Sequence, residues 1–418
     1  MSKDKNTYDI LIVGAGLAGL HCALRISKIY PKLHIAIAEA YGYVGGRVVT
    51  YTPPGQGAKS NSIHWENGAG RIHGSHKFIK NYINHYGLHL VPISSKEDWR
   101  KSVRNLEESN VWPELCEILV NFLSPLHPRI LATHTIKQIL VKTHGTKKSE
   151  EILARFPYRS EAYTLRADLA LKSFTNEMQS SENFFTVQEG LSTLVLAMHK
   201  DLESRGVKFL MNHRLLCLNK NPLEQIVSTF GSGSITSNKV ILALHSEALK
   251  KIPLFTNMPM LKHLAMKPLL RTYGIFPTPA WFSNLHATVT DSPLRHIIPI
   301  NPNQGTIMTS YTDAQDADYW LDKEDIEKET MNELRSLFPN IKIPDPLFFK
   351  THPWSEGCTY WLPGPGLYNP EEISKKIMKP FPNTFNNVYV CGESYSMRQA
   401  WMEGALEHAD SMVNKYFL

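Results

Sequence analysis

Three glycines near the start of the chain have the spacing of a loop that binds a pyrophosphate. Gly14, Gly16 and Gly19 follow the apolar run ILIV at residues 10–13, which is typical of a buried parallel strand. The first glycine permits a tight turn, the second lets a pyrophosphate approach the backbone, and the third lets a helix pack closely on the sheet. Glu39 ends a second apolar run, HIAIAEA, where its carboxylate can accept hydrogen bonds from ribose hydroxyls. These residues predict a dinucleotide-binding strand–turn–helix unit.

A second signature lies near the other end of the chain. Residues 388–407 read VYVCGESYSMRQAWMEGALE, and Gly45, Gly46 and Arg47 lie between the two signatures. The three motifs together predict a buried FAD, whereas the first alone predicts only a dinucleotide. Arg47 is suited to phosphate because a guanidinium forms fixed, charge-assisted hydrogen bonds. The alternative is an arginine that follows a turn and lies on the surface.

The elements that must position these motifs are spread along the chain. We predict a helix at 190–206, then strands in KFLMNHRLLCLNK and at 239–244, and a strand, loop and helix at 388–415. Residues 100–185 have a helical pattern. Residues 262–365 are rich in Pro, Thr and aromatic residues, which favours an antiparallel sheet with loops.

The predicted fold class is therefore α/β, with a Rossmann-like FAD-binding domain interleaved with a mixed α+β substrate domain. We predict a discontinuous FAD-binding domain at 1–92, 186–260 and 366–418. The substrate-binding domain is predicted at 93–185 and 261–365. A cofactor domain interrupted twice is the simplest arrangement, because its motifs are not contiguous in the sequence.

The composition excludes several classes of function. The net charge of +6 is spread along 418 residues without a long basic block, so nucleic-acid binding is not predicted. The five cysteines are scattered and form no CxxC, and His73 and His76 have no third ligand in metal-like spacing, so we predict no metal. No apolar run approaches the length of a membrane span, and no secretory pattern is seen, which predicts a cytoplasmic protein without a transmembrane anchor.

These motifs resemble those of the flavin amine oxidase superfamily, which includes monoamine, polyamine and L-amino-acid oxidases. The resemblance is strongest over 8–92 and 385–413 and extends across 186–250. It implies an FAD-dependent enzyme that oxidises a C–N bond of an amine or amino acid by hydride transfer to flavin N5. The imine is then hydrolysed, and O2 is the expected acceptor. The alternatives are a flavin desaturase or porphyrinogen-type oxidase, and an FAD-stabilised binding protein without catalysis.

The resemblance also implies roles for individual residues. The stretch ENGAGRI at 66–72 resembles the loop that passes along the flavin ring. The Met402 amide, near the start of a helix, is expected to face the flavin pyrimidine oxygens. The full set of expected FAD-binding residues is Gly14, Ala15, Gly16, Gly19, Glu39, Gly46, Arg47, Gly68, Ala69, Gly70, Arg71, Leu215, Glu393 and Met402.

Two features depart from the family and affect catalysis. Arg271 has the spacing of the lysine that many amine oxidases place near flavin N5, and Lys267 lies about one helical turn earlier. An arginine cannot act as a neutral base. The family usually places two aromatic rings perpendicular to the flavin to align the amine, and here the candidate rings lie in the segments WSEGCTYWLPGPG and QAWMEG. The predicted catalytic residues are Arg271, Lys267, Trp361 and Trp401, and the predicted substrate-binding residues are Arg71, Tyr360 and Trp354.

Two further residues carry open alternatives. Cys358 resembles the position where monoamine oxidases attach FAD covalently, but the following proline is one residue closer, and we expect a buried thiol and non-covalent FAD. Arg71 resembles the arginine that binds the substrate α-carboxylate in L-amino-acid oxidases. It can equally face the flavin or a phosphate, and then it says nothing about the substrate.

Overall fold

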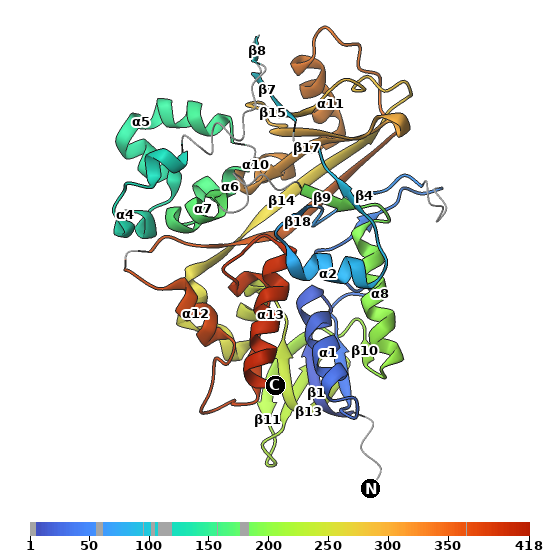
Figure 1. Ribbon diagram of the computed structural model, residues 1–418, viewed down its shortest axis with the longest axis vertical. Coiled ribbons are helices and arrows are strands. Elements are labelled where there is room, and N and C mark those ends of the chain that lie inside the picture. The colour runs from blue at the N-terminus through green and yellow to red at the C-terminus, as the bar shows by residue number, and fades with distance from the viewer. Residues whose placement is uncertain are drawn as a thin grey trace.

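The computed structural model describes residues 6–55, 62–94, 96–101, 105–107, 119–156, 158–175, 184–364 and 366–418. The molecule is elongated, with one sheet in its lower half and another in its upper half (Figure 1). Among the described residues, no helix is both long and apolar enough to cross a bilayer.

The first sheet is built on the predicted dinucleotide-binding unit. Its strand order is β10-β2-β1-β13-β12-β11, and β19 pairs with β13. The strands of this sheet are β1 (Thr7–Val13), β2 (Ile35–Ala38), β10 (Lys208–Leu210), β11 (Leu215–Lys220), β12 (Ile226–Phe230), β13 (Gly233–Leu242) and β19 (Val388–Val390). The central strands are parallel, whereas β11 and β12 form an antiparallel extension. Parallel strands are buried on both faces, which explains their continuous apolar runs.

Three helices cover one face of this sheet. They are α1 (Leu17–Ile29), α8 (Leu191–Ser204) and α13 (Met402–Tyr416), which lie in front of it in Figure 1. Ile10 and Ile12 of β1 pack in the same apolar cluster as these helices, whereas Leu11 and Val13 belong to the cluster on the other face. The N-terminal and C-terminal signatures are thus brought side by side, because α1 and α13 pack in one core.

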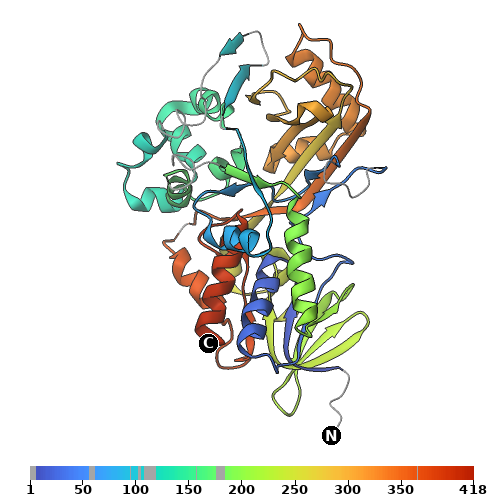
Figure 2. The same cartoon turned by 45° about the vertical axis from the view of Figure 1, so that its right-hand side comes forward.

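The second sheet has the order β18-β14-β17-β16-β15-β7-β8. Its strands are β14 (Leu264–Ile275), β18 (Phe348–Trp361), β17 (Thr306–Asp313), β16 (His296–Asn301), β15 (Ala287–Thr290), β7 (Glu97–Lys101) and β8 (Asn105–Glu107). The antiparallel pairing predicted for 262–365 is confirmed. The long strands β14 and β18 cross from the lower half into the upper half (Figure 2).

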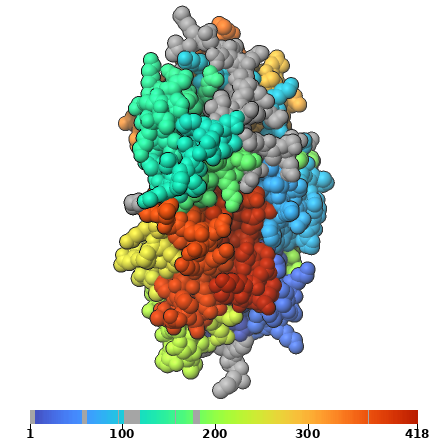
Figure 3. All heavy atoms as spheres, turned by 60° about the vertical axis from the view of Figure 1, so that its left-hand side comes forward, coloured from blue at the N-terminus to red at the C-terminus, as the bar shows by residue number. Residues whose placement is uncertain are grey.

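The helical prediction for 100–185 is wrong at its start. Residues 105–107 form β8, which pairs with β7, and β7 pairs in parallel with β15. Trp99 of β7 is buried against Val289 of β15, so tertiary pairing overrides the local pattern. The helices that follow are α4 (Pro128–Thr133), α5 (Ile136–Ala154), α6 (Arg159–Tyr163) and α7 (Ala167–Ser173). In Figure 3 they lie directly above the C-terminal segment.

Shorter elements complete the described fold. Two small sheets contain β3 (Thr50–Tyr51) with β4 (Trp65–Glu66), and β5 (Ile72–His73) with β9 (Phe184–Val187) and β6 (Leu90–Pro92). The other α-helices are α2 (Lys77–His85), α9 (Ser246–Lys250), α10 (Ala314–Leu321), α11 (Ile326–Leu337) and α12 (Pro370–Ile377). Short 3-10 turns lie at Pro253–Phe255, Pro259–His263, Pro302–Gln304 and Glu393–Tyr395.

Candidate active site

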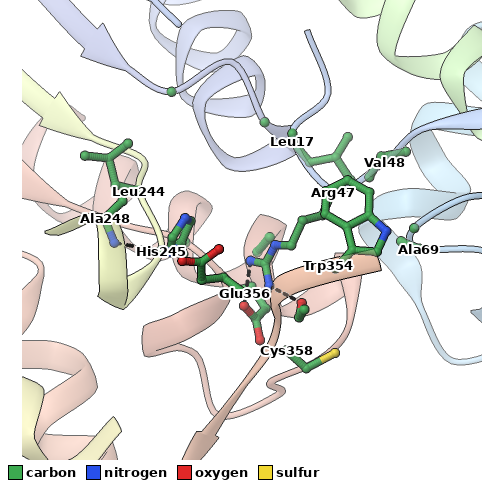
Figure 4. Close-up of a pocket in the computed structure, with 18 of the residues that line it drawn as sticks. Leu17, Arg47, Val48, Ala69, Leu244, His245, Ala248, Trp354, Glu356 and Cys358 are labelled. Carbon is green, nitrogen blue, oxygen red and sulfur yellow. Dashed lines mark hydrogen bonds and ion pairs between the residues drawn. The ribbon is translucent and has the colours of Figure 1, made fainter. Parts of the chain in front are cut away.

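A cavity of about 600 Å³ lies where the two sheets meet. Its walls include the loops after β1 and β13, the start of α13, and residues of β14, β17 and β18. Figure 4 shows one part of it, where Arg47 comes together with Trp354 and Cys358 of β18. A ligand site at the carboxyl ends of parallel strands is the usual position in open α/β sheets.

The glycines of the first loop perform distinct tasks. Gly14 has φ +107°, and a Cβ there would lie 2.5 Å from the carbonyl oxygen of Ala243. A Cβ on Gly19 would lie 2.0 Å from the Gly14 carbonyl oxygen, so these two glycines are required by packing. Gly16 instead lines the cavity, and the nearest atom to a Cβ there is the Gly45 carbonyl oxygen at 3.9 Å. This position therefore leaves space for a ligand to approach the backbone.

The N-terminus of α1 is suited to an anion. Gly16, its N-cap residue, has no side chain to cap the helix, and no acidic residue lies in the first turn. The N–H groups of a first helical turn have no partner within the helix, and the helix dipole favours negative charge there. The loop at Gly45 runs beside it, since the Gly45 N–H donates to the Ala15 carbonyl at 2.8 Å. The backbone thus forms a cradle that fits a pyrophosphate.

Glu39 lies beside this cradle and lines the cavity. Its carboxylate accepts hydrogen bonds from the Ala15 N–H at 2.8 Å and from the Tyr41 N–H at 3.0 Å. These bonds orient the carboxylate at the end of β2. A carboxylate has about four lone-pair sites, so it retains capacity to accept from ribose hydroxyls. Ala15 is itself buried and contributes its backbone N–H rather than a wall of the cavity.

Arg47 and Glu393 form an ion pair that joins the two signatures. Arg47 Nη2 donates to Glu393 Oε2 at 2.7 Å, and Nη1 donates to the Gly357 carbonyl at 2.7 Å. Glu393 also accepts from the Ala400 N–H at 2.7 Å and from the hydroxyl of Thr359 at 3.2 Å. Burial by itself lowers the pKa of Arg47, but Glu393 more than offsets this, and the net pKa is raised. The guanidinium is thus a fixed cation in the cavity wall (Figure 4).

Arg271 holds the loop that was predicted to pass along the flavin ring. Its Nη1 donates to the carbonyl of Glu66 at 3.1 Å and to the carbonyl of Gly68, and its guanidinium lies 4.6 Å from the centre of the Tyr311 ring. Burial by itself lowers the pKa of Arg271, but Tyr311 and Tyr273 raise it above the ordinary value. Arg271 therefore remains a cation that lines the cavity, and it cannot accept a proton.

The aromatic candidates separate into two groups. Trp354, Tyr360 and Trp401 line the cavity. Trp354 Nε1 donates to the Asn67 carbonyl at 3.0 Å, which fixes its indole against the same loop. Trp361 does not line this cavity: its Nε1 donates to the Ser396 carbonyl at 3.0 Å, and its ring borders a second, smaller cavity of about 160 Å³.

The remaining predicted residues also divide by position. Gly46, Gly68, Ala69, Gly70, Arg71, Leu215 and Met402 line the cavity together with the residues above. Gly19 and Lys267 do not line it. Lys267 lies opposite Cys358 in the pairing of β14 with β18, and the register of that pairing shifts between Lys267 and Leu269.

Arg71 projects into a largely aromatic wall. Its guanidinium lies 4.6 Å from the ring centre of Tyr158, 5.5 Å from that of Phe184 and 5.9 Å from that of Trp401. No hydrogen bond or ion pair joins Arg71 to any other residue in the described ranges. A guanidinium on aromatic faces retains its in-plane N–H donors for an anion.

Cys358 faces the cavity from β18 (Figure 4). Burial, followed by the charge of Glu393, raises the pKa of its thiol to about 12. The thiol is therefore protonated at neutral pH, and a protonated thiol is a poor nucleophile.

Several residues of the cavity lie outside the set predicted from the sequence motifs. Tyr158, Glu161, Tyr311 and Asp313 line its upper part, and Arg214 lines it next to Leu215. The first four come from segments where the family resemblance is weak. One signal was present for Asp313, because an acidic residue ends the otherwise uncharged strand TIMTSYTD. Across the part of the chain that the structure describes, no three His, Cys, Asp or Glu residues are grouped so as to hold a metal.

A family model for flavin-containing amine oxidoreductases matches residues 17–413. The chain belongs to this family. Its curated relatives include an L-amino acid oxidase of Cerastes cerastes, 22% identical over 97% of this chain and 86% of that protein, and one of Demansia vestigiata, 24% identical over the same shares. A solved structure of putrescine oxidase with bound putrescine is 16% identical, with a TM-score of 0.74 and coverage of 98% of this chain and 99% of that one.

The family membership confirms the main predictions from the sequence. The protein is an FAD-dependent amine oxidoreductase with the predicted fold class, and neither alternative function gains support. The cavity fits the cofactor on its own geometry. Gly16 leaves space beside an uncapped helix N-terminus, and Arg47 is a fixed cation near it. The roles of individual residues and the domain boundaries remain predictions.

Proposed function

We propose that this protein oxidises an α-amino acid or another amine that carries a carboxylate, and that Arg71 binds this carboxylate. The observation that carries the proposal is a guanidinium in the cavity wall without an anionic partner among the described residues. A charged hydrogen bond contributes about 1.5–3 kcal/mol, and a guanidinium can form two of them to one carboxylate. The relatives include L-amino-acid oxidases and a putrescine oxidase, which supports both amino acids and diamines as substrates, and Arg71 favours the amino acid.

The chain's residues would divide the work as follows. The α1 N-terminus, Arg47 and Glu39 would hold the pyrophosphate and ribose of FAD, and the loop at 68–70 would lie along the ring. When bound, FAD supplies the acceptor for the hydride that leaves the carbon next to the amine nitrogen. Trp354, Tyr360 and Trp401 would shape the substrate space and exclude water from it.

Arg271 would act as a positioning residue rather than as a base. Its two bonds to backbone carbonyls hold the loop at 66–68, and its raised pKa keeps its protons in place. Dioxygen as the acceptor is supported by the name oxidase in the relatives. Non-covalent FAD is supported by the protonated state of Cys358. The cytoplasmic location stays a prediction from the sequence.

Anaerobic reduction of the bound FAD tests the proposal. A panel of amino acids, simple amines and polyamines is mixed with the protein, and loss of the flavin absorbance is followed. We expect amino acids to reduce the flavin fastest, and Arg71→Lys to raise their apparent Kd while FAD content is unchanged. Arg129→Lys is the matched control, because Arg129 is exposed and lies away from the cavity. Rapid reduction by a polyamine that is unchanged in Arg71→Ala would refute the carboxylate role.

A further inference from the structure

Two carboxylates line the cavity on the side formed by α6 and the end of β17. Asp313 is the last residue of β17, and Glu161 lies in the first turn of α6. Both line the same cavity as Arg71 and Arg271. Asp313 is 7% exposed. The cavity thus contains buried groups of both signs, contributed by different elements.

Asp313 has no ion pair among the described residues. Its two oxygens accept only long bonds from the Ser160 N–H, at 3.2 and 3.3 Å. The nearby cation Arg159 is occupied by Asp316, to which it donates two hydrogen bonds, and the charged side chain of Arg295 also lies 3.8 Å from Asp316. Burying a carboxylate without a counterion is costly. A cationic group of a ligand would supply that counterion.

Asp313 and Arg71 are linked through two aromatic residues of the cavity wall. Tyr311 and Asp313 are two positions apart on β17, so they face the same side, about 7 Å apart along the strand. The Tyr311 ring packs on Tyr158 with ring centres 5.1 Å apart, and Arg71 lies over Tyr158. The strand β17 and the packed rings of Tyr311 and Tyr158 thus connect the carboxylate with the guanidinium.

We propose that Asp313 and Glu161 form a binding site for a second cationic group of the substrate, so that the substrate is an amino acid with a positively charged side chain. This inference rests on the amino-acid oxidation proposed above. Arg71 binds the carboxylate, and the two acidic residues bind the distal ammonium or guanidinium. Such a cavity rejects an amino acid with a neutral side chain, because Asp313 would then stay buried without a partner.

Matched pairs of ligands test the charge requirement. L-Lysine is compared with L-norleucine, and L-arginine with L-citrulline, because each pair differs mainly in the side-chain charge. Cadaverine carries two amines without a carboxylate. Binding to the FAD-loaded protein is measured by anaerobic calorimetry, and reduction is measured by flavin absorbance. We expect the cationic member of each pair to bind at least about tenfold more tightly, and cadaverine to bind more weakly than lysine.

Three variants locate the effect. Asp313→Asn and Glu161→Gln should each remove most of the lysine preference: lysine should bind more weakly, and norleucine should bind more tightly, because the buried charge that disfavours a neutral side chain is gone. An asparagine at 313 still offers an oxygen to the Ser160 N–H, so folding should be retained, which FAD content checks. Asp318→Asn is the control, because Asp318 is exposed on α10 and outside the cavity. The variant at 161 keeps the test valid if the variant at 313 fails to fold.

The outcomes separate this inference from the proposed function. If norleucine binds and reduces the flavin as well as lysine does, amino-acid oxidation stands and the cation site is refuted. Equal weakening of lysine and norleucine in both variants also refutes it. If cadaverine binds as tightly as lysine, the ligand is a diamine and the amino-acid assignment is overturned. If lysine binds with the expected dependence on Asp313 but no amine reduces the flavin, the cation site stands and the oxidation proposal fails.

Discussion

Replacing Glu393 with glutamine tests whether the ion pair with Arg47 joins the two ends of the chain. The substitution keeps the shape of the side chain but removes its charge and replaces one acceptor with an NH2 donor. That donor must then face either Arg47 Nη2 or the Ala400 N–H, each 2.7 Å from a carboxylate oxygen. One of these two bonds is therefore replaced by a contact between donors.

The size of the effect follows from burial. Glu393 is 6% exposed, whereas the Arg47 side chain is 29% exposed. Breaking a fully buried ion pair costs about 3–5 kcal/mol, and pairs at the surface contribute about 0–1 kcal/mol. Because solvent partly screens Arg47, we expect the free energy of unfolding of the apoprotein to fall by about 2–4 kcal/mol. FAD should also dissociate more readily, since Arg47 loses the partner that orients it.

Urea unfolding of the apoprotein, together with FAD titration, measures both effects. Glu356→Gln is the control, because Glu356 lines the same cavity but has no close ion pair: it lies 3.9 Å from the exposed Lys251 and accepts a hydrogen bond from the hydroxyl of the neighbouring Ser355. A double-mutant cycle with Arg47→Gln should show strong coupling, because each single change disrupts the same pair. A loss below about 1 kcal/mol, with additive single effects, would refute the reasoning.

Three further predictions use single positions. Gly16→Ala should leave the stability of the apoprotein unchanged but weaken FAD binding, measured by fluorescence titration. Gly19→Ala should instead lower the stability measured by urea unfolding, because its Cβ would lie 2.0 Å from a backbone oxygen. Equal effects of the two variants on stability and on FAD binding would contradict this. Acid precipitation should release the flavin into the supernatant, and retention in the pellet that Cys358→Ala abolishes would show a covalent bond. Burial and the charge of Asp316 raise the pKa of Asp313 to about 7, above the value of about 4 that the carboxyl has in the unfolded chain. The protonated carboxyl of Asp313 therefore contributes fully to the free energy of unfolding below pH 4, and this contribution is lost as the pH rises through 7. In Asp313→Asn, the urea midpoint of unfolding should decrease less between pH 4 and pH 8 than it does in the unchanged protein. An equal decrease in both proteins would contradict the raised pKa.

The sequence was sufficient to predict the elements whose residues lie close together along the chain. Gly14, Gly16 and Gly19 lie within one strand–turn–helix unit, and their spacing identifies that unit, although the atom that a Cβ at Gly14 would meet belongs to the distant Ala243. Such a motif can be interpreted without knowledge of the distant chain, because its spacing follows from helix and strand geometry. The predicted strand and helix at 388–415 likewise appear as β19 and α13.

Tertiary structure decided which side chains share the cavity. Tyr360 and Trp361 are adjacent on β18 and have similar character, but neighbouring residues on a strand point to opposite faces, so only Tyr360 lines the larger cavity, although both border the smaller one. Arg271 and Lys267 are separated by a register shift of β14 against β18, which no local pattern indicates.

The pairs that give the site its charge also lie far apart in the sequence. Arg47 meets Glu393 across 346 positions, and Arg271 binds the carbonyl of Gly68 across 203. Asp313 comes together with Glu161 because β17 and α6 pack beside one cavity. The sequence by itself predicted the backbone cradle that is expected to hold FAD, since short-range backbone geometry makes that cradle. Only the folded chain decided which charges line the cavity, since those depend on long-range strand pairing and burial.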